Sequence, residues 1–321
     1  MIVDLNEGLY SYEKYLDDVK KMEKKYEDLI KCVTIGQSHD NRDIILLKLG
    51  YGRRYFTICS GVHGRETINP IVILALIEYY ADIYANYKEQ KAILSSKLKD
   101  FNVHVGPEYD EMILGVCIYE LLQTFTILFV PLLNPDGYMI SLKGFDQIRD
   151  EKLREKCLSK NIPHREWKYN GRGVDINRNF PSRLWRPKNS EDYVASENET
   201  IALISVFHDY KSKGFIDFHS RGKSIYYYRK EMSNQYNERQ LIIGEKLKEI
   251  TGYELVQPQE EIEEGDTGGN TVHYFSEHFF RPALTIETVD DEATFPLEQG
   301  YRQITYDEIK LVFLQFGGLI I

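Results

Sequence analysis

Short runs of mostly apolar residues limit what this chain can fold into. Residues 44–49 read Ile-Ile-Leu-Leu-Lys-Leu, which is typical of a strand covered on both faces, as in a mainly parallel sheet. Stretches with helical periodicity alternate with the apolar runs. We therefore predict an α/β fold of three layers, α/β/α, around a mixed, mainly parallel central sheet. The predicted strands include residues 44–49, 55–59, 125–133, 214–218 and 282–286.

The intervening segments are assigned from periodicity and turn residues. Ser11 is placed to cap a helix, and Pro70 suits the first turn of a second helix over about residues 71–87. The chain contains no internal repeat and no linker rich in Pro, Gly or Ser, so we expect one catalytic domain over residues 1–321. The remaining expectations are a surface excursion or frayed helix at 88–110, an extended loop with a helical piece at 141–170, a strand at 224–228 beside 214–218, and a last helix at about 306–316.

Composition excludes several classes of partner. The chain has 321 residues and a formal net charge of −10, without a basic stripe interleaved with aromatic residues, so we expect no nucleic-acid partner. It has no run of 18 apolar residues, so we expect no membrane partner. Four cysteines without Cys-x-x-Cys spacing, and a start without a secretory signal, favour a cytoplasmic protein with free thiols. The sequence leaves the oligomeric state open.

Polar residues follow four of the apolar runs. They are His63 with Glu66, the expected turn Asn134-Pro135-Asp136-Gly137, His219, and Glu287. Sites in open α/β sheets form outside the carboxyl ends of strands. Two imidazoles and one carboxylate can hold zinc and leave a position for water, and a further carboxylate can accept the proton of that water. The simpler alternative is a hydrogen-bonded structural cluster.

Five ordered motifs resemble the zinc carboxypeptidase family. The similarity begins near Tyr10 and runs almost to the C-terminus. Within the family, the segments 167–175, 217–220 and 281–287 resemble the bacterial γ-D-glutamyl-L-diamino acid (diaminopimelate) peptidases. The five motifs are His63-x-x-Glu66, Asn134-Pro135-Asp136-Gly137-Tyr138, Gly173-Val174-Asp175-Ile176-Asn177-Arg178-Asn179-Phe180, His219-Ser220 and Leu284-Thr285-Ile286-Glu287.

The resemblance implies a metal centre and a base. It implies His63, Glu66 and His219 as ligands of one Zn²⁺ per chain, and Glu287 as the general base. A salt-bridged carboxylate at the end of a strand is the structural alternative for Glu287.

The resemblance also implies roles for residues around the metal. Asp175 would accept the second ring N–H of His63 and so fix its tautomer. Asn177 and Arg178 would hold a substrate carboxylate, for which the planar guanidinium is well suited. The cation that stabilises the oxyanion corresponds to Lys168, although Arg172 is close enough in sequence to compete for that role.

Two departures from the family pattern concern the substrate. Glu264 stands where the family has a mobile tyrosine, in an acidic stretch from Glu260 that we expect to be a solvated loop. Arg221 and Lys223 follow His219, and we hypothesise that one of them pairs with an extra carboxylate of an anionic substrate. No site is predicted at the other histidines, which are His39, His104, His164, His208, His273 and His278.

These observations predict a zinc metallopeptidase that hydrolyses an amide bond by metal-activated water. The expected substrate is a peptide or muropeptide with a free carboxylate, cut at the γ-D-glutamyl-diamino acid bond of peptidoglycan-derived peptides. One alternative is a metallocarboxypeptidase that releases C-terminal residues from ordinary peptides. The other is a catalytically silent binding protein that keeps the fold.

Overall fold

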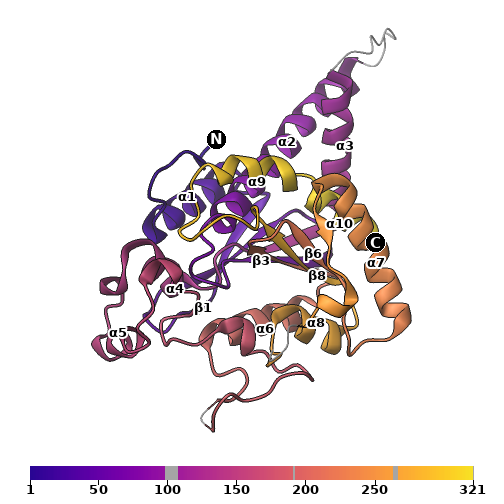
Figure 1. Ribbon diagram of the computed structural model, residues 1–321. Coiled ribbons are helices and arrows are strands. Elements are labelled where there is room, and N and C mark those ends of the chain that lie inside the picture. Colours follow the sequence, from indigo (N-terminus) through magenta and orange to yellow (C-terminus); the bar gives the residue numbers. More distant parts are fainter. Residues whose placement is uncertain (98–107, 191, 263–266, 321) are drawn as a thin grey trace.

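The computed structural model describes residues 1–97, 108–190, 192–262 and 267–320. The described residues form an eight-stranded sheet at the centre of the molecule, in the order β1-β2-β4-β3-β5-β8-β6-β7 (Figure 1). The strands are β1 (Ile30–Gln37), β2 (Asp43–Leu49), β3 (Arg54–Ser60), β4 (Phe125–Val130), β5 (Phe215–Ser220), β6 (Ser224–Tyr226), β7 (Glu254–Leu255) and β8 (Ala283–Thr288).

The sheet is mixed and parallel at its centre. Strand β3 pairs in parallel with β4 and β5, and β5 pairs in parallel with β8. Antiparallel pairs join β1 to β2, β2 to β4, and β6 to β8. The prediction that residues 224–228 lie beside residues 214–218 is wrong, because β3 and β8 already occupy both edges of β5.

Helices cover both faces of the sheet, which confirms the predicted three layers. In β3, Phe56 and Ile58 pack on one face and Cys59 on the other, as the alternation of side chains along a strand requires. The first face is covered by α1 (Tyr12–Lys25), α2 (Asn69–Lys97), α3 (Glu108–Thr124), α7 (Asn234–Thr251), α9 (Tyr301–Ile309) and α10 (Val312–Leu319). The opposite face is covered by α6 (Asn198–Tyr210) and α8 (Thr271–Phe279).

Several element boundaries differ from the predictions. The expected surface excursion at 88–110 begins as the continuation of α2 to Lys97, and α3 starts at Glu108; residues 98–107 lie outside the described part of the chain. Helices α2 and α3 project together from the body of the molecule (Figure 1). The expected last helix is two helices, α9 and α10, separated at Lys310 and Leu311.

Short helices flank the polar motifs. The expected turn at Asn134 is instead the N-cap of α4 (Pro135–Lys143), where the Asn134 side chain accepts a hydrogen bond from the Gly137 N–H. The predicted helical piece within 141–170 is α5 (Glu151–Leu158). Single 3₁₀ turns are η1 (Phe145–Gln147), η2 (His164–Glu166), η3 (Ile176–Arg178) and η4 (Pro258–Glu260). None of the described helices combines the length and apolarity needed to cross a bilayer.

Candidate metal centre and active site

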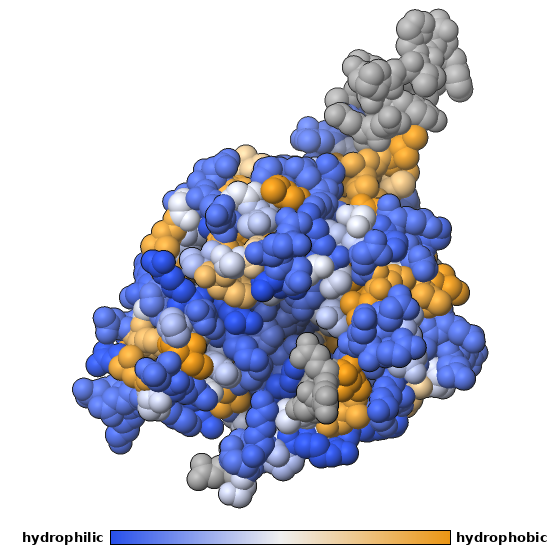
Figure 2. Space-filling model, in the orientation of Figure 1, coloured by the Kyte–Doolittle hydropathy of each residue, from blue (hydrophilic) through white to orange (hydrophobic). Residues whose placement is uncertain are grey.

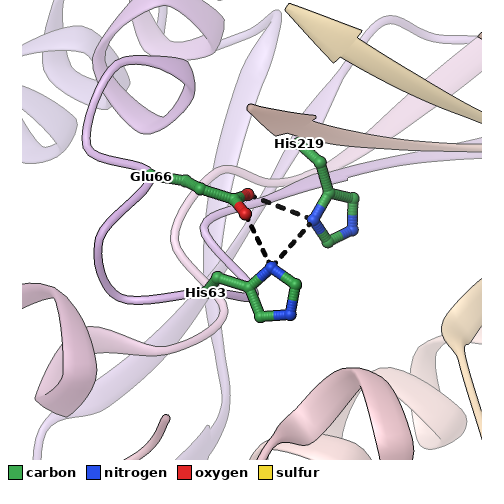
Figure 3. Close-up of side chains that lie close together, drawn as sticks. All are labelled: His63, Glu66 and His219. Carbon is green, nitrogen blue, oxygen red and sulfur yellow. Dashed lines mark hydrogen bonds and ion pairs between the residues drawn. The ribbon is translucent and has the colours of Figure 1, made fainter. Parts of the chain in front are cut away.

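His63, Glu66 and His219 lie together at the carboxyl ends of β3 and β5. Nδ1 of His63 is 2.6 Å from Oε1 of Glu66, and Nδ1 of His219 is 3.1 Å from Oε2 of the same carboxylate. The two Nδ1 atoms are 3.3 Å apart (Figure 3). Two residues from one loop and one from a distant strand therefore point their polar atoms at a single place.

Close backbone packing holds the loop that carries His63. A Cβ at Gly64 would lie 2.3 Å from the carbonyl oxygen of Gly137 in α4, so only glycine fits there. The side chain of Asn134 donates to the carbonyl oxygens of Val62, at 3.0 Å, and Tyr169, at 3.1 Å. The Asn-Pro-Asp-Gly motif thus joins the end of β3 to the segment that precedes Asp175.

The register of the sheet places Glu287 beside His219. Strands β5 and β8 run parallel, and His219 is the register partner of Glu287. Register partners point to the same face, so both side chains lie on one face, near the carboxyl ends of the two strands. Oε2 of Glu287 is buried and has no hydrogen-bond partner among the described residues. Burying an acceptor without a hydrogen-bond partner costs folding free energy, and such groups often have a catalytic role.

Each imidazole has a carboxylate at its outer nitrogen. Oδ1 of Asp175 lies 3.3 Å from Nε2 of His63, and the role that the resemblance implies for Asp175 stays a prediction. Oδ2 of Asp217 lies 3.1 Å from Nε2 of His219 and also accepts a hydrogen bond from the hydroxyl of Thr271. No role was predicted for Asp217 from the sequence. Its position two residues before His219, on the same face of one strand, is the signal that could have found it.

The charges of these groups act strongly on one another. Burial alone would raise the pKa of Glu66, but His63 and His219 outweigh it and lower that pKa to about 2. Burial likewise opposes protonation of His219, yet Asp217 and Glu66 raise its pKa well above the usual value. Burial raises the pKa of Glu287 to about 8. In the absence of a cation, the cluster therefore holds protons that a metal ion would replace.

The donor set fits zinc. Neutral imidazole nitrogen and carboxylate oxygen are ordinary zinc ligands, at about 2.0–2.2 Å. Ligand atoms at that distance in a tetrahedron are separated from each other by about 3.3 Å. The Nδ1–Nδ1 separation of 3.3 Å between His63 and His219, and the separation of 3.1 Å between His219 and Glu66, match this spacing. Three donors leave a fourth position open.

Of the two candidate oxyanion cations, Lys168 lies closer to the cluster. Its Nζ is 2.7 Å from Oδ2 of Asp175, whose other oxygen contacts His63. Arg172 instead points toward the buried Glu197, with 3.6 Å between the charged atoms. Contacts within the protein thus favour Lys168 over Arg172 at the metal centre.

Asn177 and Arg178 sit in the 3₁₀ turn that follows Asp175. The Asn177 side chain accepts a hydrogen bond from the N–H of Thr271, at 3.2 Å, which joins this turn to α8. The Arg178 guanidinium donates to the carbonyl oxygen of Asn177, at 2.8 Å, and is half-buried. Both residues are therefore held close to Asp175 by the local backbone.

Arg221 and Lys223 are engaged by carboxylates of the chain itself. Arg221 pairs with Asp291 at 2.7 Å, and Lys223 lies 2.6 Å from Glu308 and 3.0 Å from Asp290. The Asp291 side chain is 80% exposed, so its pair with Arg221 is worth no more than about 1 kcal/mol. A substrate carboxylate could displace Asp291, whereas Lys223 is held from two sides.

The expectation of a wholly solvated acidic loop at 260–264 is wrong for Glu261. Its side chain is 4% exposed and lies 2.7 Å from Nε2 of His273 and 3.7 Å from Arg229. Arg229 is a fully buried cation, so it needs a partner of opposite charge inside the protein. Glu264, which takes the place of the family's tyrosine, lies outside the described residues.

A second cluster of potential ligands consists of His39, Glu197 and Glu199. Glu197 lies 3.1 Å from Nε2 of His39 and accepts hydrogen bonds from Ser196, at 2.6 Å, and Asn170, at 2.7 Å. With Arg172 also nearby, Glu197 is well satisfied by the protein itself. His39 therefore has a partner within the protein, and the absence of a site there stays a prediction.

A two-His, one-Glu donor set beside a buried carboxylate, at the carboxyl edge of an α/β sheet, is the arrangement of a metal-dependent hydrolase. The sequence matches the family described as zinc carboxypeptidase over residues 14–109 and 117–308. The chain belongs to the zinc carboxypeptidase family and is a zinc metallopeptidase. Members of this family use one catalytic zinc.

Individual relatives are distant but cover most of the chain. It is 23% identical over 320 residues to γ-D-glutamyl-L-diamino acid endopeptidase 1 of Lysinibacillus sphaericus. That match covers 95% of this chain and 71% of the relative. It is 23% identical over 267 residues to carboxypeptidase B2 of Rattus norvegicus, covering 76% of this chain and 53% of the relative. The structure of bovine thrombin-activatable fibrinolysis inhibitor has a TM-score of 0.72 at 18% identity, covering 98% of this chain and 97% of that one.

Proposed function

We propose that this metallopeptidase hydrolyses the γ-D-glutamyl-diamino acid bond of peptidoglycan-derived peptides. The observation that carries the catalytic part is the cluster of His63, Glu66 and His219, with polar atoms 2.6–3.3 Å apart and Glu287 on the neighbouring strand. The substrate is supported by the similarity of nearly the whole chain to a γ-D-glutamyl-L-diamino acid endopeptidase.

We assign His63, Glu66 and His219 as the ligands of one zinc ion. Bound zinc polarises the substrate carbonyl and lowers the pKa of a water molecule toward neutrality. Asp175 and Asp217 fix the rings of His63 and His219, so that Nδ1 of each ring faces the centre.

Glu287 is the proposed general base. Its unpartnered carboxylate oxygen accepts the proton of the attacking water and then delivers it to the nitrogen of the leaving amine. Lys168 stabilises the negative charge that develops on the carbonyl oxygen, and it does so as a point charge without the bidentate geometry of arginine. Asn177 and Arg178 hold a carboxylate of the substrate. Arg221 is a further candidate contact if a substrate carboxylate replaces Asp291 as its partner.

The first alternative is release of C-terminal residues from ordinary α-linked peptides, as suggested by similarity to carboxypeptidase B2. The products formed from defined peptides distinguish γ-D-glutamyl-diamino acid peptidase activity from ordinary carboxypeptidase activity. Zinc-loaded protein is incubated with L-Ala-γ-D-Glu-diaminopimelate peptides and with α-linked peptides of equal length, and the products are mapped by mass spectrometry. Cleavage of the γ-linked bond alone supports the proposal, and trimming of the α-linked peptides alone refutes it.

The second alternative is a silent binding protein with the same fold. Glu287→Gln serves as the control in the product assay, because it removes the proposed base and keeps the size of the side chain. Hydrolysis by the wild type that requires zinc, is lost on chelation and is absent in Glu287→Gln excludes the silent alternative. A wild-type protein that binds zinc but cleaves neither set of peptides supports it.

A further inference from the structure

A cavity of about 430 Å³ opens beside the candidate metal centre. Asp175 belongs to both places, since its carboxylate contacts His63 and its side chain also lines the cavity. The volume falls in the range of small-ligand sites. Figure 2 shows a hollow near the centre of the visible face, bordered largely by hydrophilic side chains. A ligand that reaches the metal centre can therefore extend into this cavity.

The described lining of the cavity is mostly basic although the protein is acidic. The whole chain carries a formal net charge of −10, yet the described residues that line this cavity include two acidic and six basic side chains. A concave surface lined by one sign of charge concentrates the electrostatic potential and attracts ions of the opposite sign. The basic side chains come from three separate segments and are Lys156, Lys160, Arg172, Arg178, Arg186 and Lys188.

Four of these cations remain available to a ligand. Within the described part of the chain, no carboxylate forms a salt bridge with Lys156, Lys160, Arg186 or Lys188. Arg186 uses one guanidinium nitrogen for backbone carbonyl oxygens of its own loop, and none of the described carboxylates pairs with its charge.

The acidic side chains of the cavity do not compensate the four cations. The two carboxylate oxygens of Asp175 contact Lys168 and His63, which belong to the candidate metal centre. Asp192 accepts hydrogen bonds from the N–H groups of Lys188, at 2.9 Å, and Asn189, at 3.2 Å, within its own loop. Among the residues that the structure describes, the cavity thus keeps an excess of positive charge.

We propose that the four available cations of this cavity bind the α-carboxylate of the γ-linked D-glutamate of the substrate, a carboxylate other than the one assigned to Asn177 and Arg178. The inference rests on the proposed peptidase function and specifies the substrate further. It selects peptides in which the α-carboxylate of the γ-linked glutamate is free and disfavours those in which this carboxylate is amidated.

The test compares two peptides that differ in one charge. They are L-Ala-γ-D-Glu-diaminopimelate and the same peptide with the α-carboxylate of glutamate converted to the carboxamide. Trp185 lines the cavity and the only other tryptophan, Trp167, is buried, so quenching of tryptophan fluorescence reports binding without any need for turnover. The Trp185→Phe variant verifies that the signal comes from the cavity.

The variants remove single charges at the surface. In zinc-loaded Glu287→Gln protein, Lys160→Gln and Lys188→Gln are each expected to raise Kd for the carboxylate peptide about two- to five-fold, and together about ten-fold. Kd for the amidated peptide should not change. Lys152→Gln is the matched control, because Lys152 is exposed on the same helix as Lys156 but does not line the cavity.

The outcomes separate this inference from the proposed function. If wild-type protein cleaves the γ-linked peptide while the two lysine variants bind both peptides as the control does, the inference is overturned and the function stands. If neither peptide is cleaved but the charge-dependent change in Kd remains, the cavity is an anion site and the proposed function is wrong. Inorganic phosphate that quenches Trp185 at the same concentration as the peptide would also overturn the inference.

Discussion

His219 and Glu287 are register partners on the parallel strands β5 and β8. The strand that supplies the proposed second imidazole ligand is therefore next to the strand that supplies the proposed base. Their relative position is set by backbone hydrogen bonds of the sheet and not by a flexible loop. Sites carried by rigid elements keep their geometry more accurately than sites on loops.

Replacing Glu287 by glutamine should abolish most activity without loss of zinc. A glutamine cannot accept the proton of the attacking water, so kcat/KM is expected to fall about 10²- to 10⁴-fold. The fold should remain intact, since the uncharged amide is easier to bury than a carboxylate. Steady-state kinetics and the zinc content of the purified protein check this, with the exposed Glu298→Gln as control. Equal activity of the two variants would rule out Glu287 as the base.

Replacing Asp217 by asparagine should weaken zinc binding. The carboxylate at Nε2 of His219 makes the ring a better ligand and fixes its orientation, and such partners are worth about 10- to 100-fold in metal affinity. Competition with a chromogenic chelator measures the affinity directly. Asp209→Asn on α6 is an exposed control that should bind zinc as the wild type does. If Asp217→Asn binds zinc equally well, its contact with His219 is only structural.

Adding one methyl group at Gly64 should damage both the fold and the metal centre. The Cβ would meet the backbone oxygen of Gly137 at 2.3 Å, and backbone atoms cannot move aside as a side chain can. We expect Gly64→Ala to lose about 1–3 kcal/mol of unfolding free energy, together with zinc affinity. Gly318→Ala, where a Cβ meets nothing within 4 Å, is the matched control in urea unfolding. Wild-type behaviour of Gly64→Ala would mean that the two loops are not packed this closely.

Glu199 should make the protein less stable as the pH rises. Burial raises its pKa to about 7, above its value of 4.5 in the unfolded chain. A carboxyl group with a raised pKa in the folded state contributes stability that is fully present below pH 4.5 and is lost as the pH rises through 7. The loss at pH 8 is at most about 3 kcal/mol, from roughly 1.4 kcal/mol per pKa unit.

The Glu199→Gln variant tests this directly. Glutamine cannot ionise, so the variant should gain stability relative to wild type between pH 5 and pH 8. The readout is the difference in urea unfolding free energy between variant and wild type at each pH, which cancels the pH dependence of other groups. The exposed Glu238→Gln should show a constant difference. A difference that is also constant for Glu199→Gln would show that Glu199 ionises freely.

The sequence predicted the sheet and the cluster because both depend on local patterns. Apolar runs such as residues 44–49 are typical of strands covered on both faces, and a polar residue that follows such a run lies near the carboxyl end of its strand. His63, Glu66 and His219 therefore met as expected. Their roles, and the single-domain organisation, stay predictions.

The parts that the sequence did not predict depend on tertiary packing. Helices α3, α6 and α8 were missed, and the strand over residues 224–226 was paired with the wrong neighbour, because pairing is decided by which strand edges remain free. The ion pair between Glu261 and His273 was missed for a similar reason. Glu261 lies in a polar segment, so its sequence context predicts a solvated side chain. Only the tertiary structure shows that it contacts the buried Arg229.

The most direct test of the account is a crystal structure of the zinc-loaded protein with anomalous diffraction data collected at the zinc absorption edge. The account predicts one anomalous peak about 2.0–2.2 Å from Nδ1 of His63, Nδ1 of His219 and the carboxylate of Glu66, with Glu287 facing the open position. A strong peak at any other place, with these three side chains left without metal, would contradict it.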